Sequence, residues 1–346
     1  MSDSIINDIR DIQSFKKITF SKYKKTDVKK SLIQCILKES VEESCYFCSE
    51  LICSGHFIEI WEIILLIVSK HIHLSNPKLP YYIYNRFENF KNIMSTYKYF
   101  NELELRNDSK IRELFVEIVC ILCYSKKSHI YEKIKIDDLD FDMITMQKKL
   151  KAPSVDYAVD IFKSEDPKEL FISINELSYN IKEKNILKVC YWIEWILKFE
   201  SKCKKRRDKL ICERRSFVIV EEKHQKDIIW MIWEVILSYK NKNKLCDQMI
   251  DSLFNLFCIR YTTSVKSKRR FILYFCVSLL CSNVNYNIPI IVNDNIQKID
   301  IIKSNIDKIY MQIKENEIRP KTDYLFYGTK KDRAKKSLDK MKKMNE

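Results

Sequence analysis

Four residues near the N-terminus have types and a spacing that could hold a metal ion. Cys45, Cys48, Cys53 and His56 follow a C-x2-C-x4-C-x2-H pattern. A tetrahedral zinc site needs four such ligand atoms around one ion. Residues 45–53 have a strongly helical pattern, however, and a rise of 1.5 Å per residue spreads them over about 12 Å. Because four ligands cannot converge from one straight helix, we expect core cysteines here and no metal or other cofactor.

Two C-x-x-C pairs, Cys45–Cys48 and Cys120–Cys123, could also support redox chemistry. In thioredoxin-like proteins such a pair begins a helix, where the helix dipole lowers the pKa of the thiol. Both pairs here lie late or centrally in apolar helical patterns, which does not favour a reactive thiolate. A zinc site that joins the two pairs across helices stays open as an alternative.

The motifs of common enzymes are missing from the chain. It has five histidines and no HExxH, GxSxG or kinase-type set. Only two glycines occur, Gly55 and Gly328, against an average usage of about 7%. Glycine-rich phosphate loops and dinucleotide fingerprints are therefore excluded. We assign no catalytic residues and expect that the protein is not an enzyme.

An acidic cluster lies near the middle of the chain. Asp137, Asp138, Asp140 and Asp142 could bind a cation, but they lack the glycine and the terminal glutamate of an EF-hand loop. The sequence therefore favours a solvated linker at this position.

The chain is strongly basic, and its positive charge is concentrated. It carries 62 Lys and Arg against 47 Asp and Glu, a formal net charge of +15. Four stretches are basic: 16–30, 202–215, 266–270 and 330–346. Basic patches on a body of low charge are the footprint expected of a polyanion binder. The alternative is compositional, since Lys, Ile and Asn are abundant throughout, as in proteins of AT-rich genomes.

Two of these stretches supply the candidate nucleic-acid contacts. The density of positive charge in a loop at about 200–226 suits phosphate neutralisation. The cluster at 266–270 falls at the start of a predicted helix, where positive charge opposes the helix dipole. That cost suggests an anionic partner: DNA, RNA or an acidic protein. The candidate residues are Lys204, Lys205, Arg206, Arg207, Arg214, Arg215, Lys266, Lys268, Arg269 and Arg270.

Helical periodicity dominates, and the sequence predicts an all-α fold, a multi-helix bundle in two packed halves. Ser40 and Glu43 have the spacing of a capping box, and Gly55 that of a left-handed C-cap. Only residues 287–294 have a strand pattern. The predicted helices are 27–39, 41–54, 57–73, 81–96, 109–125, 154–163, 167–182, 185–199, 225–240, 244–261, 267–283 and 295–316.

Composition divides the chain into five regions. We predict a basic N-terminal arm at 1–26, helical domain 1 at 27–125, a linker at 126–153, helical domain 2 at 154–319 with the basic loop 200–226, and a basic flexible tail at 320–346. No stretch reaches the ~20 apolar residues that span a bilayer, and the N-terminus has no signal-peptide core. Thirteen cysteines are expected as free thiols of a reducing compartment. We expect an intracellular protein, in cytoplasm or nucleus, without a membrane partner.

A weak internal echo suggests a duplicated helical hairpin. Residues 45–52 (CYFCSELI) resemble residues 190–197 (CYWIEWIL), and WEIIL from Trp61 resembles WEVIL from Trp233. The two echoes occur in the same order, which indicates two related halves. Chance similarity between aromatic helices is the alternative. The aromatic residues of the second copy, Trp192 and Trp195 among them, are expected in the core.

One segment also resembles a known family. Residues 44–77 are similar to the helical C-terminal region of clamp-loader-related AAA+ ATPases of the RarA-like, maintenance-of-genome-stability type, in which a Tyr-Trp pair, a Gly-ended helix and a Ser-x-x-Ile-x-Leu-x-x-Pro run follow one another. The matching residues are Tyr46, Phe47, Gly55, Ser69, Ile72, Leu74 and Pro77. The family's acidic residues after the serine are Lys70 and His71 here, and the ATPase module is absent. The resemblance implies a collar that mediates oligomerisation in replication or repair, without ATPase activity.

The leading hypothesis is therefore a non-catalytic helical scaffold associated with nucleic acid, a clamp-loader-collar-like accessory of replication or repair that forms a homo-oligomer or binds a protein partner. The bias in Lys, Ile and Asn also resembles proteins of large nucleocytoplasmic DNA viruses. The alternative is accordingly a viral structural or assembly protein that binds an acidic partner or packaged DNA. A third class is an enzyme without a known motif, dependent on a metal at Asp138 or Asp140.

Overall fold

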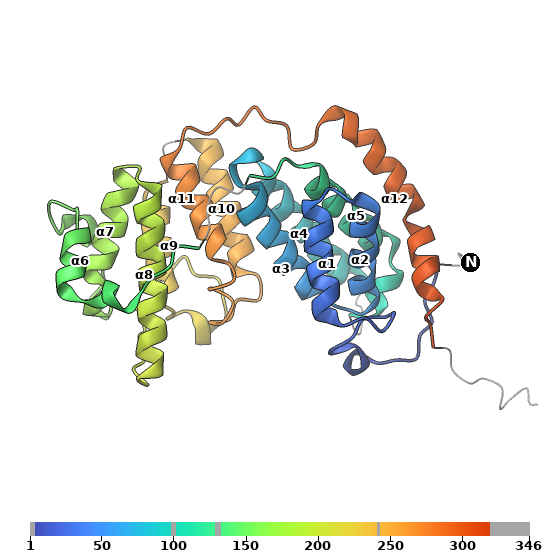
Figure 1. The fold of residues 1–346 in the computed structure, drawn as a ribbon, viewed down its shortest axis with the longest axis horizontal. Coiled ribbons are helices and arrows are strands. Elements are labelled where there is room, and N and C mark those ends of the chain that lie inside the picture. The colour runs from blue at the N-terminus through green and yellow to red at the C-terminus, as the bar shows by residue number, and fades with distance from the viewer. Residues whose placement is uncertain (1–3, 98–101, 129–132, 241–242, 319–346) are drawn as a thin grey trace, which may run out of the picture.

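The computed structural model describes residues 4–97, 102–128, 133–240 and 243–318 (Figure 1). Across these residues the chain forms twelve α-helices and no β-strand, which confirms the all-α prediction. The helices are α1 (Lys25–Leu37), α2 (Val41–Cys53), α3 (Phe57–Leu66), α4 (Leu79–Tyr97), α5 (Ser109–Tyr124), α6 (Met143–Lys149), α7 (Phe171–Lys182), α8 (Ile186–Lys205), α9 (Ile229–Ser238), α10 (Lys244–Cys258), α11 (Arg270–Cys281) and α12 (Asn293–Lys314). The predicted basic tail at 320–346 lies outside the described residues.

Two predicted elements are wrong. The helix predicted at 154–163 is a set of turns with one 3-10 turn, Asp156–Ala158. Of its apolar residues only Ala158 and Ile161 are buried, and helices in proteins depend mainly on packing an apolar face. Of the strand predicted at 287–294, residues 287–292 are irregular chain and residues 293–294 begin α12; no neighbouring strand is described that could pair with the segment.

The ends of α2 show one failed prediction and one confirmed. Ser40 is the N-cap residue, but its side chain makes no capping hydrogen bond, so the predicted capping box does not form. At the other end Gly55 adopts φ +74°, as predicted for a left-handed C-cap. An added Cβ at Gly55 would meet Leu103 at 3.1 Å. Both the positive φ and this close contact therefore favour glycine at the position.

The packing of the first five helices is repeated by α7 to α11. In the first half α1 packs on α2 and α3, while α5 packs on α1, α2 and α4. In the second half α7 packs on α8 and α9, while α11 packs on α7, α8 and α10. The two sequence echoes fall on matching helices, α2 with α8 and α3 with α9. The similarity therefore extends from a hairpin to five helices in each half.

Helix α12 packs against the first half, although its residues fall within the predicted helical domain 2. The chain after α11 crosses over the first half and ends in α12 at its far side (Figure 1). There α12 packs on α2 and α5, and Arg112 of α5 donates to Asp307 at 2.7 Å and lies over the Tyr310 ring. Ile299, Ile306 and Tyr310 are buried. Residues 293–314 thus belong to the first half, because their apolar face completes its core.

The predicted linker 126–153 also contains structure. Helix α6 lies within it, preceded by a 3-10 turn, Asp138–Phe141, and this segment packs on α8 of the second half. The Trp195 indole N–H donates to the carbonyl of Asp140 at 3.0 Å, and the Tyr191 hydroxyl donates to its carboxylate at 3.1 Å. Asp140 therefore anchors the segment on α8, where Asp138 also pairs with Lys202 at 2.9 Å. Asp142 caps the N-terminus of α6 instead.

The two halves meet along a seam of helices. Helix α4 packs on α10, and a π-helical turn that extends α3, Ile67–Ile72, packs on α11. His73 follows this turn with φ +50° and stacks on Phe275 of α11, with ring centroids 4.6 Å apart. The segment that carries Ser69 and Ile72 of the family resemblance is therefore part of the seam.

Replacing His73 tests how the seam responds to acid. Burial lowers the pKa of His73 to about 4, against about 6.5 in an unfolded chain. Between these values only the unfolded chain binds the proton, so His73 makes the protein less stable as the pH falls from about 6.5 to 4. We expect His73→Phe, which keeps the stack on Phe275, to lose about 2 to 3 kcal/mol less than the wild type between pH 7 and pH 4.5. Urea unfolding at the two pH values measures this, and an equal loss in both proteins contradicts it.

Candidate nucleic-acid interface

The exposed candidates gather at the C-terminal end of α8, which projects beyond its half (Figure 1). Lys204 and Lys205 lie in its last turn, where positive charge favours the helix dipole, and Arg206 and Arg207 follow. Lys204 pairs with Glu200 at 3.2 Å. Among the described residues Lys205, Arg206 and Arg207 have no carboxylate within ion-pair distance, and Arg214 nearby is also exposed without one. These cations are available to an anionic partner.

Arg215 lies in the core, although it ends the same basic stretch. Its side chain is 1% exposed and donates to both carboxylate oxygens of Asp166, at 2.6 and 2.5 Å. It also donates to Glu234 at 2.7 Å. Burial alone would raise the pKa of Asp166, but the Arg215 guanidinium and the backbone N–H groups of Lys163 and Glu213 together hold that pKa below its usual value. Arg215 therefore ties the basic loop to the core and cannot contact a phosphate.

Lys266 is buried in the same way. Its ammonium group donates to Glu200 and to Asp227, each at 2.6 Å, and the side chain is 3% exposed. The hydroxyl of Tyr261 donates to the second oxygen of Asp227 at 3.0 Å. The cluster joins the end of α8 to the start of α9 and to the turn before α11. Lys266 is thus a structural cation.

Arg269 and Arg270 also bind carboxylates inside the protein. Arg269 donates to the carbonyls of Phe257 and Ile259, at 2.6 and 2.7 Å, and to Glu62 of the first half. Arg270 donates to Glu194 of α8 at 2.7 Å. Of the predicted cluster at 266–270, only Lys268 is exposed and without an ion pair among the described residues.

The structure adds two cations that the candidate set did not include. Lys29 of α1 is half-buried, and burial lowers its pKa. The nearby charges of Lys268 and Lys25 lower this pKa further, while the carboxylates of Glu59 and Glu62 oppose the shift. Lys25 itself pairs with Glu59 at 2.8 Å. Two basic stretches that are far apart in sequence, 16–30 and 266–270, thus meet at one place. Sequence periodicity contains no signal for this meeting, because it depends on how the halves pack.

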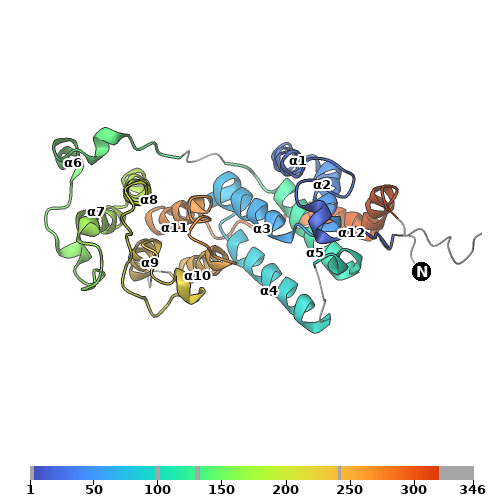
Figure 2. The same cartoon turned by 90° about the horizontal axis from the view of Figure 1, so that it is seen from below.

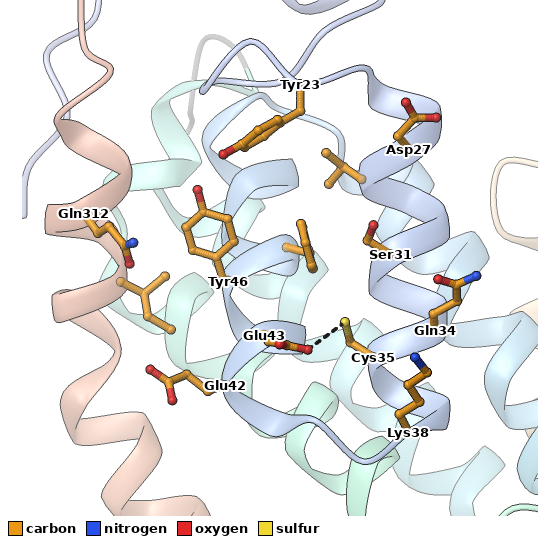
Figure 3. Close-up of a pocket in the computed structure, with 13 residues that line it drawn as sticks. Tyr23, Asp27, Ser31, Gln34, Cys35, Lys38, Glu42, Glu43, Tyr46 and Gln312 are labelled. Atoms are coloured by element: carbon orange, nitrogen blue, oxygen red, sulfur yellow. Dashed lines mark hydrogen bonds between the residues drawn. The ribbon is translucent and has the colours of Figure 1, made fainter.

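A groove on the first half has the opposite charge. It has a volume of about 850 Å³ and lies between α1, α2 and α12. Its carboxylates are Asp27, Glu42 and Glu43, while the rings of Tyr23 and Tyr46 approach each other at one end (Figure 3). Asp27 and the glutamates lie in the first turns of α1 and α2, where negative charge favours the helix dipole. An acidic groove repels phosphate, so nucleic acid is not expected here.

The cysteines are packed in the core as thiols, as predicted. All thirteen are free and buried. Burial and a hydrogen bond to Glu43 raise the pKa of Cys35 to about 11, and burial raises that of Cys123 to about 12. Such thiols are protonated at neutral pH, which is the opposite of what redox chemistry requires. Within the described ranges no group of three or more His, Cys, Asp or Glu side chains could hold a metal ion.

Comparison with protein-family models, with curated proteins and with solved structures found no match for this chain. None of the helices in the described ranges is both long and apolar enough to cross a membrane. The functional argument therefore depends on the surface itself.

Two neighbouring lysines provide a direct test of the division between buried and exposed cations. Lys266→Met leaves Glu200 and Asp227 buried without their cation, and we expect the free energy of unfolding to fall by about 3–5 kcal/mol. Lys268→Met removes an exposed charge two residues away and should change it by less than about 0.5 kcal/mol. Urea denaturation of both variants measures the difference. Equal stability of the two variants would contradict the burial of Lys266.

Proposed function

We propose that the protein is a non-catalytic helical scaffold that binds nucleic acid through the end of α8. The observation that carries the proposal is the group of exposed cations without ion pairs at Lys205, Arg206, Arg207 and Arg214. Lys205, Arg206 and Arg207 are consecutive at the end of α8, and Arg214 lies in the loop that follows. Counterion release from phosphates contacted by such a group supplies sequence-independent affinity.

A second contact is supported by Lys29, Lys25 and Lys268. Glu59 and Glu62 offset part of this positive charge, so Lys268, which is exposed and has no ion pair among the described residues, is the cation of this patch most accessible to a phosphate. The patch includes residues from both halves, so a nucleic acid bound here would contact the seam. A replication or repair accessory of the collar type is the setting that the family resemblance suggests, and it belongs to the same proposal.

Fluorescence anisotropy of labelled single- and double-stranded DNA tests the proposal across about 50–300 mM salt. We expect binding that weakens steeply with salt. In the double variant Lys205→Glu with Arg206→Glu, we expect weaker binding. The slope of log affinity against log salt concentration should be smaller in magnitude by about two, because each lost phosphate contact lowers that slope by about one. Lys268→Glu tests the second patch in the same assay.

The matched control changes the same charge at the other end of α8. Lys184→Glu with Lys188→Glu alters the exposed Lys184 and the half-buried Lys188, about 25 Å away at 1.5 Å per residue, and should bind almost like the wild type. Equal loss in both double variants would mean that only net charge matters. Weak, salt-insensitive binding by the wild type would refute the nucleic-acid proposal and favour an acidic protein partner.

A further inference from the structure

The groove between α1, α2 and α12, which lies on the near side of the first half in Figure 2, has apolar and aromatic walls. Val28, Tyr46, Phe47 and Ile309 contribute to these walls, and Tyr23 lies at one end with 49% of its surface exposed. The rings of Tyr46 and Phe47 meet edge-on at a centroid distance of 5.6 Å. A volume of about 850 Å³ gives room for several side chains of a bound peptide.

The carboxylates of this groove have no cationic partner among the described residues. Asp27 and Glu42 are exposed and form no ion pair there, and Glu43 accepts only from the thiol of Cys35, at 3.4 Å. The one cation in the lining is Lys38, which lies beyond ion-pair distance of all three. The lining therefore has an excess of negative charge and favours an occupant that is both apolar and basic.

The lysines of α1, a helix that is described in full, do not neutralise these carboxylates. None of them lines the groove. Lys25 pairs with Glu59 of α3 at 2.8 Å, and Lys29 is affected by Glu59 and Glu62 of the same helix. These lysines thus interact with α3, and the negative charge of the groove remains available.

The chain that continues beyond α12 has the composition of such an occupant. Residues 324–327 are Tyr-Leu-Phe-Tyr, and residues 330–346 contain eight Lys and Arg against three Asp and Glu. This segment lies outside the described residues, which end at Ile318. An aromatic run followed closely by positive charge complements aromatic walls and carboxylates without ion pairs.

The described chain ends beside the groove. Gln312 of α12 lines it, and four residues later Asn316 donates to the hydroxyl of Ser21 at 3.1 Å. Ser21 is two residues before Tyr23, which lies at the end of the groove where its ring approaches that of Tyr46 (Figure 3). The segment beyond Ile318 therefore begins near the aromatic end of the groove.

The length of the connection allows the segment to reach the whole groove. Six residues separate Ile318 from Tyr324 and can span up to about 20 Å. The side of the groove from Asp27 to Lys38 is about 16 Å long at 1.5 Å per residue. A connection this short holds the segment at a millimolar effective concentration, so weak contacts are enough to keep it bound.

We propose that residues 324–333 bind in this groove of their own molecule, as an interaction separate from the surface at the end of α8. The aromatic run 324–327 packs against Tyr46 and its neighbours, and Lys330 and Lys331 face Glu42 and Glu43. Cations bound to these carboxylates are withheld from other anionic partners. The groove therefore competes with nucleic acid for the basic segment.

Disulfide trapping in the full-length protein tests the proposal. All thirteen native cysteines are buried, so two added thiols are the ones that react readily. Ser31→Cys places one thiol in the groove with little change of size, and Thr329→Cys places the other between the aromatic run and the lysines. A disulfide requires Cα atoms within about 7 Å of each other. At about 1 μM protein, a concentration far below the effective concentration of the segment, we expect it to form within one molecule.

Two matched controls separate binding from random contact. Met311→Cys with Thr329→Cys uses an exposed residue of α12 that does not line the groove, and it should be trapped about tenfold more slowly. Adding Glu42→Gln and Glu43→Gln to the groove pair should slow trapping about fivefold. Adding Glu113→Gln and Asp300→Asn, at exposed positions outside the groove, should leave the rate unchanged.

The rates are measured by non-reducing electrophoresis, and mass spectrometry of the linked peptides identifies the disulfide. Equal trapping at Met311 and at Ser31 would overturn the proposal, as would a rate that does not depend on Glu42 and Glu43. Disulfides that form only between two molecules would also overturn it, because the groove would then bind the segment of a second copy.

Discussion

The second half of the molecule depends on a positive charge buried with two negative ones. The ammonium group of Lys266 lies between Glu200 and Asp227, which come from the end of α8 and from the residues before α9. Removing a charge from water is costly, and only close opposite charges offset that cost. The turn between α10 and α11 must therefore stay against α8, and Arg269 and Arg270 extend the same restraint to Glu62 and Glu194.

This constraint divides the basic residues of the chain into two kinds. Arg215, Lys266 and Arg269 are buried and bind carboxylates, so they contribute to the core. Lys205, Arg206 and Lys268 remain in water without ion pairs among the described residues, so they determine the electrostatic field that a partner meets. A basic run in the sequence is thus a poor guide to a binding surface, because adjacent cations can have opposite environments.

The repeated packing of the halves explains where the surface features occur. Helices α4 and α10 occupy matching positions and pack on each other, which forms the seam. A cavity of about 600 Å³ with Trp61, Phe87 and Phe90 in its walls opens along this seam, and the meeting of Lys29 with Lys268 also requires both halves. The insertion at α6 has no counterpart among the described helices of the first half and carries the exposed apolar side chains of Leu139, Met143 and Ile144. Features that could engage partners thus arise where the two repeats meet or differ.

The sequence by itself determined eleven of the twelve described helices, the buried tryptophans, the unreactive cysteines and the glycine turn at Gly55, because these depend on local periodicity and residue chemistry. It also indicated the repeat, through the Trp-Glu echoes. Only the tertiary structure decided that Glu62 and Glu234 of those echoes bind Arg269 and Arg215, and that α12 completes the first half. The reason is physical: an ion pair or an apolar face is satisfied by whichever residues the fold brings close, and those partners are separated by up to about two hundred residues of sequence.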